Sequence, residues 1–214
     1  MTPAVDITLK NGTPAETRAR GALLELLTKH DLTGWIFTNA VEVDETAWPH
    51  SHPVLTLNTQ HTDNESMFLA EFLHEQLHWF EEERATDRDG AILETARYYS
   101  SVPSARPEGA GDEGSTRLHL LVCFLEYQAL KRLQGNKRAR RTITALSRHH
   151  YCWVYRTVLR DERKIEAIIR KFGLLPEPLL RVAEREVMRL DESGGKVKAA
   201  VRMKTNEVRP LKYQ

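Results

Sequence analysis

The 214-residue sequence is poor in the features that mark secreted and membrane-spanning proteins. It has only two cysteines, Cys123 and Cys152, too few for the disulfide framework of a small secreted domain. No apolar run approaches the roughly 20 residues that cross a bilayer. The first residues, MTPAVDITLKNG, lack the charged and apolar segments of a signal peptide. We therefore expect a cytoplasmic protein that does not span a membrane.

An excess of charge of either sign is also missing. The chain has 31 Lys and Arg against 30 Asp and Glu, a formal net charge of +1. The near-zero net charge therefore gives no overall electrostatic attraction for nucleic acid. We do not expect nucleic acid as a partner. The densest basic run is KRARR at 137–141, without an aromatic residue among its cations. A solvated basic connector over 136–141 is the simpler interpretation, and a phosphate-contacting patch is the alternative.

Periodicity and turn residues predict a mostly helical chain with a small sheet near its start. Residues 35–43, WIFTNAVEV, and 54–58, VLTLN, favour two strands, which we expect to pair antiparallel. The fold class is thus α+β, with a single domain over 1–190, a helical C-terminal half and a polar basic tail over 191–214. Apolar spacing, capping residues and glycine stops predict helices over 14–29, 64–85, 91–100, 116–133, 142–159, 162–172 and 176–190.

Two histidines four positions apart, with a glutamate directly after the first, stand in LAEFLHEQLHWFEEE at 69–83. On a helix His74 and His78 share one face, one turn apart, so both imidazoles can bind one metal ion. Glu75 lies beside the first histidine, where its carboxylate can reach a metal-bound water. This spacing on a helix is typical of zinc hydrolases. It favours a metal site over the alternative that the two histidines only form a polar face of the helix. The sequence therefore predicts a Zn²⁺ site on a metal-binding helix beside the sheet.

The motif resembles that of the zincin metallopeptidases, and a later segment resembles their glutamate-ligand branch, the gluzincins. In that branch a glutamate from a later helix completes the site, often within the pattern Glu-x-x-Ala. Residues 126–133, EYQALKRL, fit the pattern, so the resemblance implies that Glu126 binds zinc together with His74 and His78. Glu126 also follows the apolar stretch LHLLVCFL, where an unpaired carboxylate costs several kcal/mol.

Two other residues remain alternatives for the third ligand. Glu94 has a spacing from the motif that other glutamate-type zincins use, but Arg97 follows it at the position where alanine is expected. His119 lies seven residues before Glu126, on the same face of the predicted helix. It can instead contact substrate or be a hydrogen-bonded core histidine.

The resemblance implies a metallopeptidase that hydrolyses peptide or protein substrates. Zinc lowers the pKa of its water, and Glu75 acts as general base and then as general acid. His150 and Tyr151, within SRHHYCWVY at 147–155, are the expected donors to the oxyanion. The resemblance also implies that an extended substrate lies along a strand at 55–58. The Pro- and Gly-rich loop over 103–115 is expected to cover the cleft.

Three other functions stay open from the sequence. The same zinc chemistry serves hydrolases that act on non-peptide bonds, because the motif specifies water activation and not the acyl group. A non-catalytic zinc protein needs the ligands alone, and the intact Glu75 argues against it. A nucleic-acid-associated protein would use the basic run at 137–141.

Overall fold

Three short strands lie beside a set of helices in the structure, a computed structural model that describes residues 4–181. The chain divides into one unit that ends at Pro176 and a second unit that follows it. The few described residues of the second unit are helical. Most of the predicted helix over 176–190, the predicted domain end at 190 and the predicted tail over 191–214 lie outside the described residues.

The strands form one parallel sheet in the order β1 (Asp6–Leu9), β2 (Ala40–Val43) and β3 (Leu55–Leu57). The prediction of an antiparallel sheet is therefore wrong. Helix α1 (Pro14–Lys29) carries the chain back along the sheet between β1 and β2, so the second strand runs in the direction of the first. Strand β1 was not predicted from the sequence, because it has only four residues, DITL, and half of them are polar.

The helices confirm a mostly helical fold, and their bounds correct several predictions. Helix α5 begins at Asn136, so the basic run over 137–141 belongs to a helix and not to a connector. The predicted helix over 142–159 is two helices, because residues 147–151 form a turn. Among the described residues, no helix has both the length and the apolar character that crossing a bilayer requires. The helices that follow the sheet are α2 (Glu65–Glu82), α3 (Ala85–Tyr98), α4 (Glu113–Gln134), α5 (Asn136–Leu146), α6 (Cys152–Arg160) and α7 (Glu162–Lys171).

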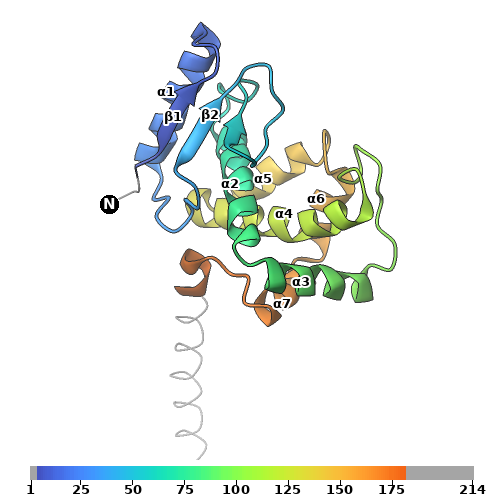
Figure 1. Cartoon of the computed structure of the whole chain (residues 1–214). Coiled ribbons are helices and arrows are strands. Elements are labelled where there is room, and N and C mark those ends of the chain that lie inside the picture. The colour runs from blue at the N-terminus through green and yellow to red at the C-terminus, as the bar shows by residue number, and fades with distance from the viewer. Residues whose placement is uncertain (1–3, 182–214) are drawn as a thin grey trace, which may run out of the picture. The chain divides into compact units, whose positions relative to one another are not determined.

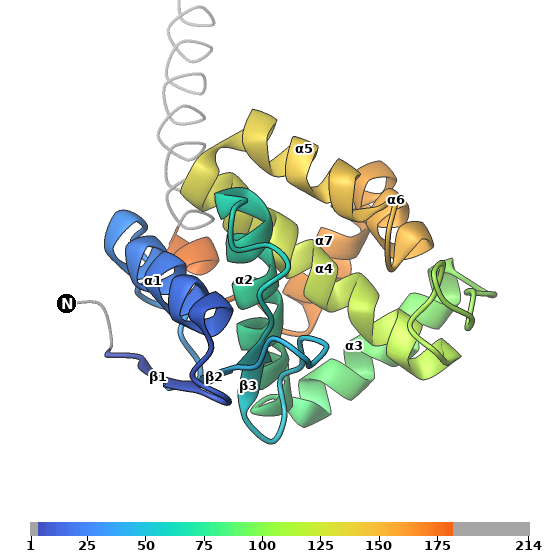
Figure 2. The same ribbon diagram turned by 90° about the horizontal axis from the view of Figure 1, so that it is seen from above.

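Helix α4 is the centre of the helical half and packs against α2, α3, α5, α6 and α7. Its middle is almost wholly buried, including Leu120, Val122 and Phe124. Figure 1 shows α2 between the sheet and helices α4 and α6, with α4 crossing it, and Figure 2 shows α4 between α2 and α6. The two most buried helices of the chain therefore meet, and polar residues at their crossing are shielded from water.

Gln76, inside the histidine motif, ties α2 to the segment that precedes β2. It is fully buried, and its Oε1 accepts the backbone N–H groups of Phe37 at 2.7 Å and Thr38 at 2.9 Å. Its Nε2 donates to the carbonyl of Thr38 at 2.9 Å. The middle one of the three residues between the two motif histidines thus anchors α2 to the sheet side of the fold.

We expect Gln76→Ala to lower the free energy of unfolding by about 3 kcal/mol, because each buried group left without a partner costs about 1–3 kcal/mol. Urea denaturation followed by circular dichroism measures the change. Gln60→Ala is the matched control, since Gln60 is exposed and its loss should change stability by no more than about 0.5 kcal/mol. A loss below about 1 kcal/mol in Gln76→Ala would contradict the anchoring role.

Candidate metal centre

The motif forms on one face of α2, as predicted. Asn64 caps the helix, and its side-chain oxygen accepts the backbone N–H of Met67 at 3.2 Å. The rings of His74 and His78 lie edge to face with their centroids 5.1 Å apart. Glu75, on the same buried stretch, is only 7% exposed. The helix therefore holds both imidazoles and the neighbouring carboxylate together in a largely dry environment.

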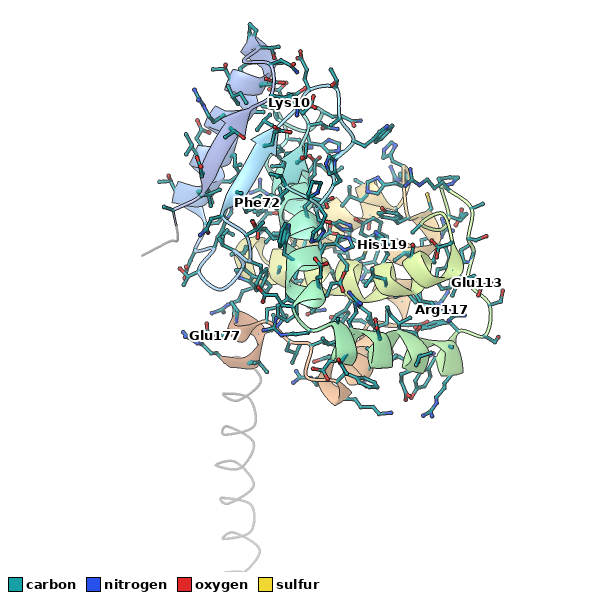
Figure 3. The ribbon with its side chains drawn as sticks, viewed as in Figure 1. Lys10, Phe72, Glu113, Arg117, His119 and Glu177 are labelled. Atoms are coloured by element: carbon teal, nitrogen blue, oxygen red, sulfur yellow. The ribbon has the colours of Figure 1, made fainter. Side chains whose placement is uncertain are left out.

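His119 of α4, labelled in Figure 3, forms a group of three possible metal ligands with these two histidines. Its ring centroid lies 5.5 Å from that of His74 and 5.1 Å from that of His78. One nitrogen from each of the three rings lies within 4.8 Å of the others. The crossing of α2 and α4 thus brings together three imidazoles at a spacing that suits a single metal ion.

Each of the three histidines uses its Nδ1 atom to contact an oxygen of the protein. Nδ1 of His74 lies 2.9 Å from Oε2 of Glu126, and Nδ1 of His78 lies 3.3 Å from Oε1 of Glu81. Nδ1 of His119 lies 2.7 Å from the carbonyl oxygen of Ser115. An Nδ1–H that donates to oxygen fixes the tautomer of a metal-binding imidazole and leaves Nε2 as the ligand atom.

Burial keeps the imidazoles of His74 and His119 in the neutral form that metal ions bind. Burial, with the neighbouring imidazoles, holds the pKa of His74 well below its usual range. Burial and His78 lower the pKa of His119 to about 3. A proton therefore does not compete for the ring nitrogens of His74 and His119 near neutral pH.

A second group of three possible ligands shares His74 with the first and adds Cys123 and Glu126. Glu126 is fully buried, its Oε2 accepts the hydroxyl of Tyr155 at 3.0 Å, and its Oε1 has no partner among the described atoms. Burial raises the pKa of the Cys123 thiol well above its usual range, which disfavours the thiolate that a metal needs. The three-histidine group is therefore the better donor set.

The structure places the other predicted ligands as follows. Glu126 lies beside the site, and its role as a direct ligand remains a prediction, since within residues 4–181 it does not form a three-ligand group with His78. Glu94 lies on α3, where its carboxylate pairs with Arg97 and with Lys171, each at 2.9 Å. These two ion pairs neutralise the Glu94 carboxylate, so its presence does not require a bound metal ion.

A cavity of about 430 Å³ opens beside His74, and Glu75, Glu126, His150 and Tyr151 are also among its lining residues. Burial and the nearby Glu71 carboxylate raise the pKa of Glu75 to about 8. Among the residues with described positions, no ion pair to Glu75 is found. Its carboxylate therefore has space for water or substrate in front of it.

Tyr151 lies closest to the histidine cluster among the predicted oxyanion donors. Its ring centroid is 4.2 Å from that of His119 and 5.8 Å from that of His74. Its backbone has φ 47° and ψ 37°, the left-handed region that side chains other than glycine rarely adopt. Burial raises the pKa of Tyr151, so that its hydroxyl stays protonated. His150 lines the same cavity, with its ring 5.2 Å from that of Tyr151.

The loop before α4 contributes the cavity residues Arg106, Pro107 and Gly109, in agreement with its expected position at the cleft. It is fastened to the start of α6, because the backbone N–H of Cys152 donates to the carbonyl of Pro107 at 2.8 Å and that of Trp153 donates to Glu108 at 3.2 Å. α6 has no side-chain cap, and these carbonyls satisfy its first N–H groups instead. A gating motion of the loop remains a prediction.

The segment before β3, and not β3 itself, borders the cavity. Trp48 and Pro49 line it, and His50 joins β3 through an isolated antiparallel bridge with Thr56. Ser51 fastens the segment to α2, because its carbonyl accepts the indole N–H of Trp79 at 2.8 Å. Residues 55–57 of β3 are not among the cavity-lining residues, and the implied substrate position along residues 55–58 remains a prediction.

The sequence analysis missed the residues that hold the histidines in place. Glu81, which contacts His78, also pairs with Arg88 at 3.1 Å, and Tyr155 donates to the carboxylate behind His74. Glu81 follows His78 by three positions, a spacing that places two residues on one helix face and so carried a signal. No comparable signal links Tyr155 to α4. Comparisons with protein-family models, with curated proteins and with solved structures found no match to this chain.

Proposed function

We propose that this chain is a zinc-dependent peptidase whose metal is held by His74, His78 and His119. The observation that carries the proposal is that all three histidines turn Nδ1 to an oxygen partner, which leaves the Nε2 atoms for one ion. Three protein ligands with an open fourth position are typical of catalytic zinc sites. In this proposal His119 takes the place that the resemblance assigns to Glu126, and Glu126 positions His74.

The residues around this group have the chemistry that hydrolysis requires. Zinc, when bound, supplies Lewis acidity and a water of lowered pKa. Glu75 accepts a proton from the attacking water and delivers it to the leaving amine nitrogen. The hydroxyl of Tyr151 donates a hydrogen bond to the carbonyl oxygen as negative charge develops on it. Each of these groups lines the same cavity.

A peptide is the substrate that the surroundings of the cavity favour. The cavity has the size range of a ligand pocket. The segment of Trp48 and Pro49 at its border offers a surface along which an extended chain can lie. The indole of Trp48 is 81% exposed, which provides an apolar contact for a substrate side chain.

Peptide cleavage by the zinc-loaded chain tests the proposed function. A library of peptides is incubated with wild type, with wild type after chelator treatment and with Glu75→Gln, and new termini are identified by mass spectrometry. Products that appear with wild type alone support a peptidase. The peptidase function is ruled out if the zinc-loaded wild type produces no cleavage, or if Glu75→Gln gives the same products at the same rate.

We expect Tyr151→Phe to lower kcat by about 10²–10³-fold, the usual cost of removing one oxyanion donor, with little change in KM. The phenylalanine ring keeps the stacking on His119, so zinc content should stay unchanged. Steady-state kinetics on the best library peptide and elemental analysis measure both quantities. His150→Ala is the comparison, with a smaller expected effect. A larger loss in His150→Ala than in Tyr151→Phe would transfer the donor role to His150.

A further inference from the structure

Helix α5 is amphipathic, and its inner face explains why the basic run is helical. Ala139, Thr142, Ile143 and Leu146 are buried at the spacing of one helix face. This face packs against α4, α2 and α6. Figure 2 shows α5 at the outer edge of the helical half, so that its other face is turned away from these helices. The helix therefore places each cation of the basic run on a defined face, which an irregular connector would not do.

The outer face of α5 and the turn after it together place four cations around one shallow hollow. Lys137, Arg140, Arg141 and Arg148 line it together with Thr144 and Ala145. All four cations are exposed. Lys137 and Arg141 are four positions apart, as are Arg140 and Thr144, so that they lie on adjacent turns. These four residues are called the α5 basic face below.

The charges of this face are not balanced by neighbouring carboxylates. Residues 127–160 contain no Asp or Glu, although the chain as a whole is nearly neutral. Within the described part of the chain, none of the four cations forms an ion pair. Arg138, on the other side of α5, does: it lies 3.7 Å from Glu65 and hydrogen-bonds Ser66 at 2.7 Å. Arg140 lowers the pKa of Glu162, but that carboxylate is already paired with Lys131.

We propose that the α5 basic face binds the phosphate backbone of a nucleic acid. Arginine and lysine side chains on the outer face of α5 and in the turn that follows it can contact several phosphates of one strand. The three arginines favour phosphate in particular, because a guanidinium can donate two parallel hydrogen bonds to it. The face has no row of base-reading or stacking side chains, so binding is expected to be independent of sequence.

An anionic membrane fits the same charges less well. A helix that binds in the membrane interface inserts large apolar side chains beside its cations. Among the described residues, the exposed large apolar side chains are on other elements, and none lies on α5. The basic face is therefore suited to a polyanion that stays outside, such as a nucleic acid strand.

The α5 basic face borders the catalytic cavity but does not share its residues. Arg148 belongs to the hollow, and the next residues, His149 and His150, line the cavity. Nucleic acid binding and peptide hydrolysis can therefore be measured independently. Loss of the first with the second intact would separate this inference from the proposed function.

Fluorescence anisotropy with a labelled 20-nucleotide single-stranded DNA, the same sequence as duplex DNA, and the same sequence as RNA tests the proposal on the full chain. With four phosphate contacts, affinity should fall by about 50- to 150-fold between 50 and 200 mM salt. Arg140→Ala combined with Arg141→Ala should weaken binding at least about tenfold and flatten the salt dependence by about two contacts. Comparison of the three probes shows which form of nucleic acid is preferred.

Arg18→Ala combined with Arg20→Ala is the matched control, because both arginines are exposed on α1 and the net charge changes equally. The control should bind like wild type, and thermal unfolding of both double variants should match wild type. Absence of binding at 50 mM salt, or equal binding by the two double variants, would overturn the proposal. Binding to phosphatidylserine vesicles without binding to any of the three nucleic acids would also overturn it.

Discussion

Glu75→Gln is expected to lower kcat for peptide hydrolysis by about 10²–10⁴-fold, the usual contribution of a general base. The amide is nearly the same size as the carboxylate but cannot accept the proton. Glu75 forms no ion pair with any residue whose position is described, so the replacement should not disturb the histidines. Steady-state assays on a peptide from the library measure kcat. Elemental analysis should still find about one zinc per chain.

Glu71→Gln is the matched control for this experiment. Glu71 lies one turn before Glu75 on α2, lines the same cavity and also has its pKa raised to about 8 by burial. It has no assigned part in proton transfer, so its replacement should change kcat by less than tenfold. If Glu75→Gln retains wild-type kcat to within tenfold, another group must move the proton. An equal loss in both variants would point to the charge of the cavity as a whole.

His119→Ala is expected to abolish stoichiometric zinc binding, as are His74→Ala and His78→Ala. Removing one of three nitrogen ligands leaves a two-histidine site that cannot hold the ion against a mild chelator. Competition with a chromophoric chelator measures the affinity. His50→Ala is the control, because His50 is exposed and belongs to neither ligand group.

Glu126→Gln separates the two possible ligand groups. If Glu126 only orients His74, its replacement should weaken zinc binding by about 10–100-fold and leave about one zinc per chain. If Glu126 is itself a ligand, its replacement should have the effect expected for His119→Ala, and His119→Ala should retain zinc. The two variants thus give opposite results under the two arrangements.

The local parts of the fold were predictable because their signals lie within a few residues. The capping box of α1 is one example: the Thr13 side chain accepts the backbone N–H of Glu16 at 3.2 Å, and the Glu16 carboxylate accepts that of Thr13 at 3.4 Å. The placement of His74, Glu75 and His78 on one buried helix is another. Each depends on helix geometry alone.

The features that could not be predicted from the sequence depend on tertiary contacts. His119 and Glu126 are two turns apart on one face of α4, and both approach His74 of α2. The point at which the helices cross decides that His119, and not Glu126, also groups with His78. The sequence correctly marked Glu126 as a buried carboxylate; a histidine and a tyrosine contact its Oε2, and its Oε1 has no partner among the described atoms. Strand direction likewise depended on β1, which is too short to recognise in the sequence.

The left-handed backbone of Tyr151 has a consequence for how this protein can evolve. A side chain in that region costs of order 1–3 kcal/mol of folding free energy, which the rest of the chain must offset. Glycine or asparagine at this position would relax the turn, and the molecule would gain stability while losing a phenol whose ring lies beside that of His119. A replacement that stabilises the fold at residue 151 therefore removes a group that the proposed activity uses. Selection for thermal stability alone would favour loss of the tyrosine at this position before other residues of the site.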